Sequence, residues 1–293
     1  MPELPEVEVV RAGLEPAVTD ATIAGVTVFD ERSLRRHDGP GEDFVDRLVG
    51  RGILSAERRG KFLWMPLAAT LAEEPEALVV HLGMSGQVLL RDRSTDDRLT
   101  RIRLELDHPQ HGPLRLNFVD QRIFGSMAVD RLLPTADAPD GLVPSQVAHI
   151  ARDPLDPLFD DRLFFERLAR RTTGVKRALL DQTLLSGVGN IYADEALWAS
   201  RVHYDQPTST LSRPRAKLLL AEVRLVLEKA LGEGGTSFDA QYVNVNGASG
   251  YFSHSLNAYG QQGKPCPRCG RPITRESFMN RGSHFCAFCQ RVR

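Results

Sequence analysis

The sequence has little that would direct it to a membrane or out of the cell. No uninterrupted apolar run approaches the roughly 18–20 residues of a membrane helix, because polar residues and glycines interrupt the longest candidate, 77–90. The first ten residues contain three glutamates and no Lys or Arg, so they lack the basic region of a secretory leader. We therefore expect a cytoplasmic protein without membrane contact.

Net charge is also low, at −1 over 293 residues. A neutral chain is a poor candidate for nucleic-acid binding, which depends largely on contacts between basic residues and phosphates. The average conceals a gradient, because residues 261–293 contain seven basic residues and one acid, which give a local charge of +6. This basic C-terminal segment favours a nucleic-acid partner.

The composition is otherwise that of a folded protein, with 42% apolar, 26% charged and 7% aromatic residues. These proportions exclude a disordered or collagen-like chain. The length allows one large domain or two modest ones.

Cysteine is scarce, and all four residues lie in the basic segment as two C-x2-C pairs separated by sixteen residues: Cys266, Cys269, Cys286 and Cys289. This spacing is typical of a four-thiolate zinc site, in which each tight turn directs two sulfurs to one ion. Two disulfides or four unrelated thiols are the alternative. Four protein ligands leave no open position, so we expect one structural Zn²⁺ that supplies folding energy to this short module.

The first half of the chain predicts one helix followed by short strands. Residues 7–18 have helical apolar spacing, with Pro5 in the first turn and Pro16 expected to end or bend the helix. Between about 21 and 130, residues 101–107 and 114–118 alternate apolar and polar, and 77–82 and 87–90 are shorter apolar runs. Closely spaced short strands predict an antiparallel sandwich or barrel.

The second half reads as a linker followed by helices. Residues 134–157 are rich in Pro, Asp and Gly, and helical patterns follow at 162–170, 175–185, 193–199 and 213–231, with Gly232 past the last. The segment 186–190, between the second and third helices, predicts a sharp turn whose backbone can approach a phosphate. The polar segment 234–250 predicts a mobile loop.

Five short motifs are spread along the chain. In chain order they are Pro2-Glu-Leu-Pro-Glu-Val-Glu8, Arg59-Gly-Lys61-Phe62, His81-Leu-Gly-Met84-Ser-Gly86, Asp120-Gln-Arg122-Ile-Phe124-Gly125 and Gly187-Val-Gly-Asn190-Ile-Tyr192-Ala193. Together with the four-cysteine finger and its Arg281, this set resembles the formamidopyrimidine-DNA glycosylase family, bacterial repair enzymes for oxidised purines. The motifs follow the family's order, and the set is far more specific than any one member.

The resemblance implies a two-domain α+β protein. A helix and an N-terminal catalytic β-sandwich would occupy 1–134, followed by a linker at 135–157, a helix–two-turn–helix DNA-binding domain at 158–233, a lesion-recognition loop and connection at 234–260, and a zinc ribbon finger at 261–293. The implied partner is double-stranded DNA with oxidised purines or abasic sites, held in the cleft between the halves. The enzyme would act as a monomer without an organic cofactor.

The implied activity is that of a bifunctional DNA glycosylase and AP lyase in base excision repair. Met1 precedes a small residue, so its removal would leave Pro2 as a free secondary amine. Attack of this amine on C1′ of a damaged nucleoside gives an iminium ion, a permanent cation that accepts electrons in β-elimination. A neighbouring helix N-terminus favours the neutral amine. On its own, a Met-Pro-Glu start is more often a simple initiator before a helix, so the role of Pro2 depends on the other motifs.

Four further residues match family positions with chemical roles. Glu3 matches a general acid/base that assists sugar-ring opening, and Glu6 a carboxylate that helps to fix the N-terminal segment. Lys61 matches a residue that contacts the phosphate next to the lesion and donates a proton in β-elimination. Arg281 matches the finger arginine that clamps phosphates and assists δ-elimination, and its position between the cysteine pairs predicts a hairpin tip.

Met84, Arg122 and Phe124 match the family's three residues that fill the gap left by an extruded base. The alternative is a core position for Met84 and Phe124 and an ordinary surface position for Arg122. Met84 lies in a glycine-flanked turn, where a core residue is uncommon. Many relatives have a basic residue at the position of Ile123, so one phosphate contact is expected to be missing here.

Other residues are candidates for contact with DNA or with the lesion. Asn190 matches a phosphate ligand, and Arg101 and Lys176 are further candidates for DNA contact. The 236–252 segment resembles the loop that folds over an extruded 8-oxoguanine, with Thr236, Tyr242 and Tyr251 as lesion contacts. His81 is expected to be a hydrogen-bonded structural residue.

Two other functions are open at this point. The sister branch, endonuclease VIII-like enzymes that prefer oxidised pyrimidines, shares the Pro-Glu start, the lysine and often the finger. The Leu4–Val7 stretch, Phe124 and the long 236–252 loop favour the purine branch. A DNA-binding protein that senses damage without cutting would retain the finger and the basic segment, whereas Pro2 and Glu3 would be expected to drift, and both are present.

Overall fold

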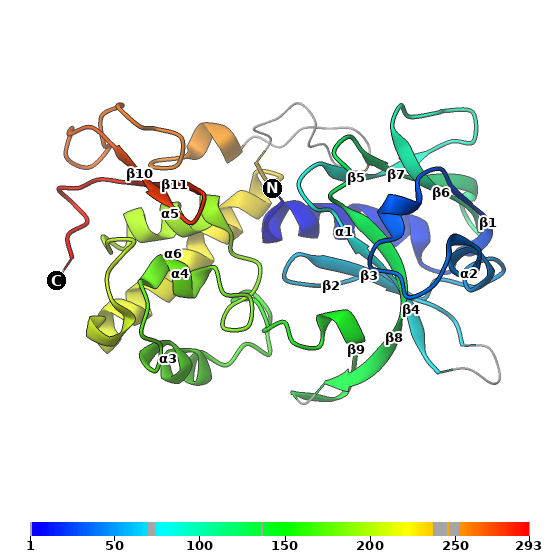
Figure 1. The fold of residues 1–293 in the computed structure, drawn as a ribbon, viewed down its shortest axis with the longest axis horizontal. Coiled ribbons are helices and arrows are strands. Elements are labelled where there is room, and N and C mark those ends of the chain that lie inside the picture. The colour runs from blue at the N-terminus through cyan, green and yellow to red at the C-terminus, as the bar shows by residue number, and fades with distance from the viewer. Residues whose placement is uncertain (1, 70–73, 136, 237–244, 246–251, 293) are drawn as a thin grey trace. The chain divides into compact units, whose positions relative to one another are not determined.

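The computed structural model describes residues 2–69, 74–135, 137–236, 245 and 252–292. The chain divides into two compact units, whose elements are labelled in Figure 1. Unit 1 comprises Met1–His149 and Thr236–Gly250, and unit 2 comprises Ile150–Gly235 and Tyr251–Arg293. Among the described residues, no helix combines the length and the apolar character needed to cross a membrane.

Unit 1 contains two antiparallel sheets, a four-stranded one of order β1-β6-β7-β5 and a five-stranded one of order β2-β3-β4-β8-β9. The strands of the first are β1 (Thr22–Val28), β5 (Gly86–Arg91), β6 (Thr100–His108) and β7 (Gly112–Asp120). Those of the second are β2 (Glu57–Arg59), β3 (Phe62–Pro66), β4 (Glu76–His81), β8 (Ser126–Thr135) and β9 (Ala138–Pro144). The helical elements are α1 (Leu4–Val18), η1 (Glu31–Leu34), α2 (Gly41–Asp46) and η2 (Ser145–Val147).

One hydrophobic core joins α1 to both sheets. Along β6, Ile102, Leu104 and Leu106 are fully buried, while the residues between them are partly exposed, as the alternating pattern predicts. The core also receives Leu14 from α1 and Leu78 from β4. The predicted antiparallel sandwich is therefore confirmed.

Helix α1 begins three residues before the predicted apolar spacing and runs through Pro16 to Val18. Pro16 therefore does not end the helix as expected. The proline lies in the last turn, where it removes the hydrogen bond to the carbonyl four residues earlier and crowds that carbonyl, but interrupts no later turn of the helix. Val7, Val10 and Leu14 are buried, so packing against the sheets stabilises the helix to its end.

The predicted linker at 135–157 is wrong in its first part, because residues 138–144 form β9 and pair with β8. Val143 is 3% exposed and stands opposite Leu133 in the antiparallel ladder. Strand β9 is an edge strand, where prolines are tolerated because the free edge needs no N–H donors. Composition alone therefore concealed a strand.

Unit 2 contains four helices among its described residues: α3 (Asp161–Ala169), α4 (Val175–Leu179), α5 (Asn190–Ala199) and α6 (Arg213–Gly232), with short η3 (Thr208–Thr210) and η4 (Phe252–Ser255). The predicted helix at 175–185 ends at Leu179. The cause is local, since the Asp181 carboxylate accepts the N–H and the hydroxyl of Thr183 at 2.9 and 2.7 Å, a turn that competes with helix. Helix α6 includes Gly232, which was expected just beyond its end.

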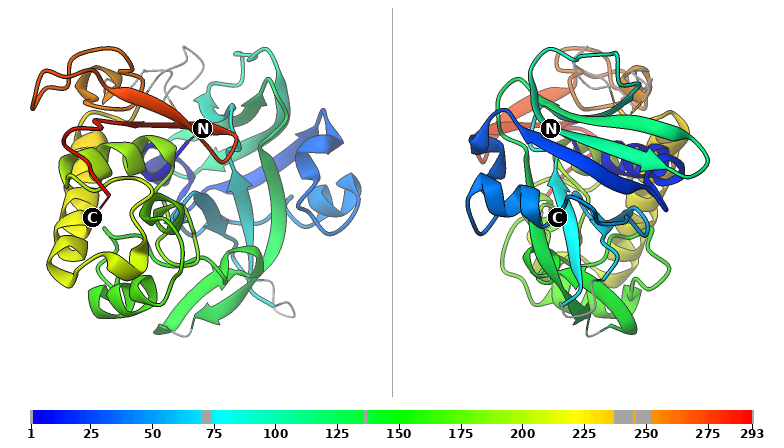
Figure 2. Two further views of the ribbon diagram at one scale, coloured as in Figure 1. Left: turned by 60° about the vertical axis from the view of Figure 1, so that its left-hand side comes forward. Right: turned by 90° about the vertical axis from the view of Figure 1, so that its right-hand side faces the viewer.

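The C-terminal segment of unit 2 forms a hairpin of β10 (Thr274–Phe278) and β11 (Arg281–Phe285). Strand β11 lies beside α5, as Figures 1 and 2 both show. The Cys266 and Cys269 pair precedes the hairpin, and the Cys286 and Cys289 pair follows it.

Candidate functional site

The N-terminal segment of unit 1 places Pro2, Glu3 and Glu6 together at the start of α1, all of them buried. Glu3 is the N-cap residue, and it forms a capping box with Glu6, whose Oε2 accepts the Glu3 N–H at 2.8 Å. Carboxylates are favoured at this positive end of the helix. The local sequence therefore fixes the backbone next to Pro2.

A second contact ties this segment to a distant part of the chain. Glu6 Oε1 accepts both the N–H and the hydroxyl of Thr236, at 2.8 and 2.9 Å, and Thr236 is only 7% exposed. Thr236 was predicted to contact the lesion. In this structure its hydroxyl donates to Glu6, so Thr236 supports the N-terminal segment. The other two predicted lesion contacts, Tyr242 and Tyr251, lie outside the described residues.

Part of the predicted mobile loop 234–250 is attached to the sandwich. Val245 is 8% exposed, belongs to the core of unit 1, and accepts the N–H of Leu90 at 3.1 Å. A Cβ at Gly13 of α1 would lie only 2.6 Å from Val245 Cγ2, so helix and segment are in close contact. An apolar residue in a polar segment was the available signal for this anchor.

Lys61 lies in the turn between β2 and β3, directly after Gly60, whose φ is +58°. Its side chain is half-buried. The next residue, Phe62, pairs with His81 across β3 and β4, and their rings are 4.8 Å apart. A left-handed glycine thus places Lys61 at the same sheet end as His81.

His81 is a hydrogen-bonded structural residue, as expected. Its Nδ1 accepts the N–H of Gly83 at 3.2 Å. Burial, followed by the positive charges of Arg36, Arg35 and Lys61, lowers the pKa of His81 to about 4. The imidazole is therefore neutral near pH 7, when it can accept this bond.

Met84, Arg122 and Phe124 lie in two loops at one end of the sandwich. Met84 is 44% and Phe124 45% exposed, and Arg122 is exposed as well. The first loop joins β4 to β5 and the second joins β7 to β8, so each crosses from one sheet to the other. Large apolar side chains at this exposure are not core residues, which excludes the alternative considered for Met84 and Phe124.

Arg101, a predicted DNA contact, has contacts within the protein. Its Nε donates to the backbone carbonyl of Asp120 at 2.8 Å, and Nη1 lies 3.5 Å from Asp30 Oδ2. The side chain is 18% exposed. Arg101 therefore belongs to the support of the Arg122 loop.

In unit 2, Lys176 is buried where a DNA contact was predicted. Its side chain is 0% exposed, and Nζ lies 2.6 Å from Asp194 Oδ1 and 3.1 Å from Ser283 Oγ. The backbone N–H of His284 donates to Asp194 Oδ2 at 2.8 Å, and His284 Nδ1 lies 3.1 Å from the same oxygen. A buried ion pair therefore joins α4, α5 and β11.

Arg281 is the first residue of β11 and is exposed. It follows a two-residue turn, Met279–Asn280, with φ values of +46° and +60°. The predicted hairpin tip is therefore confirmed. The next carbonyl, that of Gly282, accepts Asn190 Nδ2 at 3.1 Å and Lys176 Nζ at 3.4 Å. Asn190, predicted as a phosphate ligand, thus also holds the chain beside Arg281.

The four cysteines form a cluster, with ligand atoms all within 4.8 Å of one another. Four thiolates about 2.3 Å from a tetrahedral Zn²⁺ would have sulfurs about 3.8 Å apart, so the cluster fits the metal. Trp198 Nε1 donates to Cys266 Sγ at 3.4 Å, and Cys266, Cys286 and Ile273 form a small core. Bound zinc would hold both ends of the hairpin.

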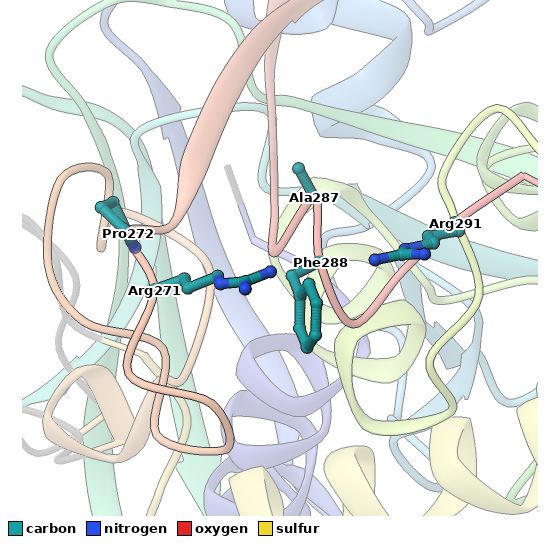
Figure 3. Close-up of a pocket in the computed structure, with 5 residues that line it drawn as sticks. All are labelled: Arg271, Pro272, Ala287, Phe288 and Arg291. Carbon is teal, nitrogen blue, oxygen red and sulfur yellow. The ribbon is translucent and has the colours of Figure 1, made fainter.

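A shallow electropositive pocket of about 280 Å³ lies on the finger around Phe288, which is 41% exposed. The guanidinium of Arg271 lies 3.5 Å and that of Arg291 5.0 Å from the centre of the Phe288 ring (Figure 3). Cation–π contact orders both side chains while their nitrogens stay near the surface. The finger therefore carries ordered positive charge beyond Arg281.

Three domain families match the chain in order. They are the formamidopyrimidine-DNA glycosylase N-terminal domain at residues 1–127, the formamidopyrimidine-DNA glycosylase H2TH domain at 150–241, and the zinc finger found in FPG and IleRS at 263–292. A catalytic sandwich, an H2TH domain and this finger together define a DNA glycosylase of base excision repair.

Full-length relatives specify the family. A formamidopyrimidine-DNA glycosylase of Leifsonia xyli subsp. xyli is 65% identical over 300 residues, covering 100% of both chains. One from Streptomyces avermitilis is 55% identical over 293 residues, covering 100% of this chain and 98% of the relative. The chain belongs to the formamidopyrimidine-DNA glycosylase family, and it has that family's glycosylase and AP lyase activities.

Solved structures agree with this assignment. The MutM (Fpg) protein of Thermus thermophilus has a TM-score of 0.81 at 36% identity, covering 99% of this chain and 98% of that one. A Lactococcus lactis Fpg mutant in complex with Fapy-dG-containing DNA has a TM-score of 0.82 at 29% identity, covering 99% of each chain. Another Lactococcus lactis Fpg structure contains abasic-site DNA.

Sequence reasoning missed the residues that hold the exposed side chains in place. Asp120 stands inside a recognised motif, and Asp194 follows another, but neither was given a role. Arg35 was not singled out. An acid placed at the end of a strand, directly before an exposed motif, was the available signal for Asp120. Arg35 acts through partners about 90 residues away, and Asp194 joins Lys176 to residues about 90 positions further along the chain, for which the sequence has no local signal.

Proposed function

We propose that this enzyme excises 8-oxoguanine and formamidopyrimidines from double-stranded DNA through a Schiff base on Pro2, and then cleaves the abasic strand by β,δ-elimination. The observation that carries the proposal is the buried start of α1, where Glu6 fixes the backbone of Glu3 beside Pro2. The relatives bound to Fapy-dG and abasic-site DNA support the substrate class.

The Pro2 amine, free once Met1 is removed, is the nucleophile. As its nitrogen forms a bond to C1′, the bond from C1′ to the damaged base breaks, and the base leaves with the electron pair and takes up a proton. The nitrogen then loses its proton, and the bond from C1′ to the ring oxygen O4′ breaks as that oxygen takes up a proton, which leaves an iminium between C1′ and the Pro2 nitrogen. The positive charge of this iminium makes the C2′ proton acidic. Loss of this proton expels the 3′ phosphate, and a second elimination expels the 5′ phosphate.

Glu3 is the proton-transfer group for this sequence. Its side chain is 2% exposed and adjoins Pro2 in the chain. A buried carboxyl group next to the nucleophile is placed to transfer a proton to the oxygen of the opening sugar ring. The Glu6 carboxylate accepts three hydrogen bonds from the protein, so its role is to hold the segment.

Lys61 and Arg281 are the phosphate-binding and elimination-assisting cations of the two units. Lys61 follows a left-handed glycine in the β2–β3 turn, and Arg281 follows the hairpin turn. Their backbone positions are therefore defined by tight turns. A cation at a phosphate stabilises the charge of the leaving group in each elimination.

Met84, Arg122 and Phe124 fill the gap that the extruded nucleotide leaves. Extrusion costs a few kcal/mol of stacking and pairing, which an apolar wedge, a cation and an aromatic ring can offset. All three are exposed on adjacent loops. The partner is double-stranded DNA, bound by a monomer in the cytoplasm, and the charge of +6 at 261–293 supports phosphate contact.

The test compares Glu3→Gln with Glu42→Gln, a first-turn glutamate of α2 outside the proposed site. On a duplex with 8-oxoguanine opposite cytosine, E3Q should excise about a hundred-fold more slowly, because proton transfer contributes about 10²–10⁴ to such steps. E42Q should act like the unmodified enzyme. Equal activity of both variants would contradict the role of Glu3. Faster removal of thymine glycol than of 8-oxoguanine would contradict the substrate class.

A further inference from the structure

The two loops that carry Met84, Arg122 and Phe124 are packed against each other. Gly83 has a φ of +62°, and a Cβ atom at this position would overlap the backbone of Phe124 and Gly125. The close approach of the two loops at this point therefore requires a residue without a side chain. A displacement of either loop must move the other.

One buried carboxylate, that of Asp120, binds both loops. Asp120 ends β7 and is 0% exposed. Its Oδ1 accepts the hydroxyl of Ser85 at 2.5 Å and the N–H of Arg122 at 3.0 Å, and its Oδ2 accepts the N–H of Gly125 at 2.7 Å. Ser85 adjoins Met84, while the two amides flank the loop segment that contains Phe124. Bonds from neutral donors to a carboxylate are strong, and here they tie the gap-filling residues to one point.

A second group, the Arg35 guanidinium, holds the same loop from the carbonyl side. It donates to the carbonyl oxygens of Ile123, at 2.8 Å, and of Phe124. Ile123 has a φ of +56°, a conformation that a β-branched residue adopts only when its surroundings impose it. Asp120 on the amide side and Arg35 on the carbonyl side impose it. In that conformation the side chains of Arg122 and Phe124 are both exposed.

We propose that Asp120 and Arg35 are positioning residues for strand insertion, which join the two loops into one preformed element that enters the gap left by an extruded base. The inference rests on the proposed gap-filling role of Met84, Arg122 and Phe124. Neither Asp120 nor Arg35 has to touch the reacting atoms. Their contribution is confined to steps on duplex DNA, because an abasic site in a single strand leaves no gap to fill.

The principal test uses Asp120→Asn, which keeps the shape of the side chain but replaces one of its two acceptor oxygens with an NH2 group, so that at least one of the backbone N–H groups loses its acceptor. The matched control is Asp130→Asn, since Asp130 also accepts one serine hydroxyl and one backbone N–H, from Ser145 at 2.7 Å and Gln146 at 2.9 Å. D120N should excise 8-oxoguanine from a duplex about ten-fold more slowly, as expected for loss of one buried bond. Cleavage of an abasic site in single-stranded DNA should change less than about two-fold, and D130N should change neither rate.

A second variant, Arg35→Gln, tests the same role with less risk of unfolding the protein, because Arg35 is exposed and its replacement leaves no charge buried without a partner. R35Q should show the same duplex-specific loss, while Arg35→Lys should recover part of it by donating to one carbonyl. Fluorescence of 2-aminopurine placed opposite the lesion should report weaker insertion in D120N and R35Q. Unchanged duplex rates in both variants, or an equal loss on single-stranded and duplex substrates, would overturn the inference.

The variants Met84→Ala and Arg122→Ala distinguish failure of this inference from failure of the proposed gap-filling role. If both retain full duplex activity, the gap-filling role itself is wrong. If they lose duplex activity while D120N and R35Q do not, the gap-filling role holds and the positioning role of Asp120 and Arg35 is contradicted.

Discussion

The exposed loops of unit 1 and the finger tip of unit 2 are both held by a buried aspartate, but by different chemistry. Asp120 accepts one hydroxyl and two backbone N–H groups. Asp194 accepts Lys176 Nζ at 2.6 Å together with donors from Ser283 and His284. The loops are thus held by hydrogen bonds from a hydroxyl and backbone N–H groups to one carboxylate. The finger tip is held by a buried ion pair and a metal-binding cluster.

The two kinds of interaction should contribute different amounts to the free energy of unfolding. Leaving a buried N–H without its acceptor costs about 1–3 kcal/mol, whereas removing one partner of a buried ion pair costs about 3–5 kcal/mol. Loss of one partner should therefore destabilise the finger tip more than the loops.

Removal of the metal should unfold the finger. Chelation should abolish the order of β10 and β11, because zinc binding supplies about 10–16 kcal/mol in finger peptides. Hydrogen exchange should show full loss of protection at 274–285 and unchanged protection in the core strands of unit 1. Protection at 274–285 that survives complete chelation would show that the Lys176–Asp194 pair suffices without metal.

Breaking the buried pair comes next. Lys176→Met leaves the Asp194 carboxylate buried without its cation, and the free energy of unfolding of unit 2 should fall by about 3–5 kcal/mol. The double variant Lys176→Met with Asp194→Leu should recover much of this loss, because neither charge is then buried alone. Denaturant unfolding followed by Trp198 fluorescence, with Trp64 replaced by Phe in every protein compared, measures both. A single variant as stable as the parent would mean that the pair does not support the finger tip.

The stability of unit 1 should depend on pH through His81. Its folded pKa of about 4 lies below the usual value of 6.5, so the unfolded chain binds the proton more readily between these values. Stability should therefore be complete above pH 6.5 and fall by up to about 3 kcal/mol as the pH decreases to 4. His81→Gln should flatten this part of the curve in urea unfolding. Identical curves for both proteins would contradict the neutral, buried state of His81.

The smallest expected effect is a gain from relief of strain. Ile123→Gly accommodates a φ of +56° without strain, so unit 1 should become more stable by about 1 kcal/mol. The same variant should excise 8-oxoguanine from duplex DNA more slowly, because the loop is no longer restricted to one conformation. Ile123→Val, which keeps the β-branch, is the control. A loss of stability in the glycine variant would show that Ile123 contributes packing that outweighs its strain.

Elements with clear periodicity could be predicted, and supports formed by distant residues could not. Alternation predicted 101–107, and the strand runs from Thr100 to His108. Cysteine spacing predicted the metal cluster, and motif matches predicted where the exposed side chains of the loops lie. Lys176 is a basic residue near a predicted DNA-binding turn, which made it a candidate for DNA contact. Only the fold shows that its side chain is buried and paired with Asp194. Proline and glycine in 138–144 concealed an edge strand, because an edge tolerates both.

The proposed reaction requires the Pro2 nitrogen to form a bond to C1′ of the damaged nucleotide, and borohydride reduction converts that bond into a stable cross-link. The enzyme, with its N-terminus shown to be a free proline, would be mixed with an 8-oxoguanine·cytosine duplex and reduced, and the adduct would then be digested and mapped by mass spectrometry. We predict one cross-link per enzyme, on the N-terminal peptide at Pro2. A cross-link on Lys61 or any other amine, with Pro2 unmodified, would contradict the account.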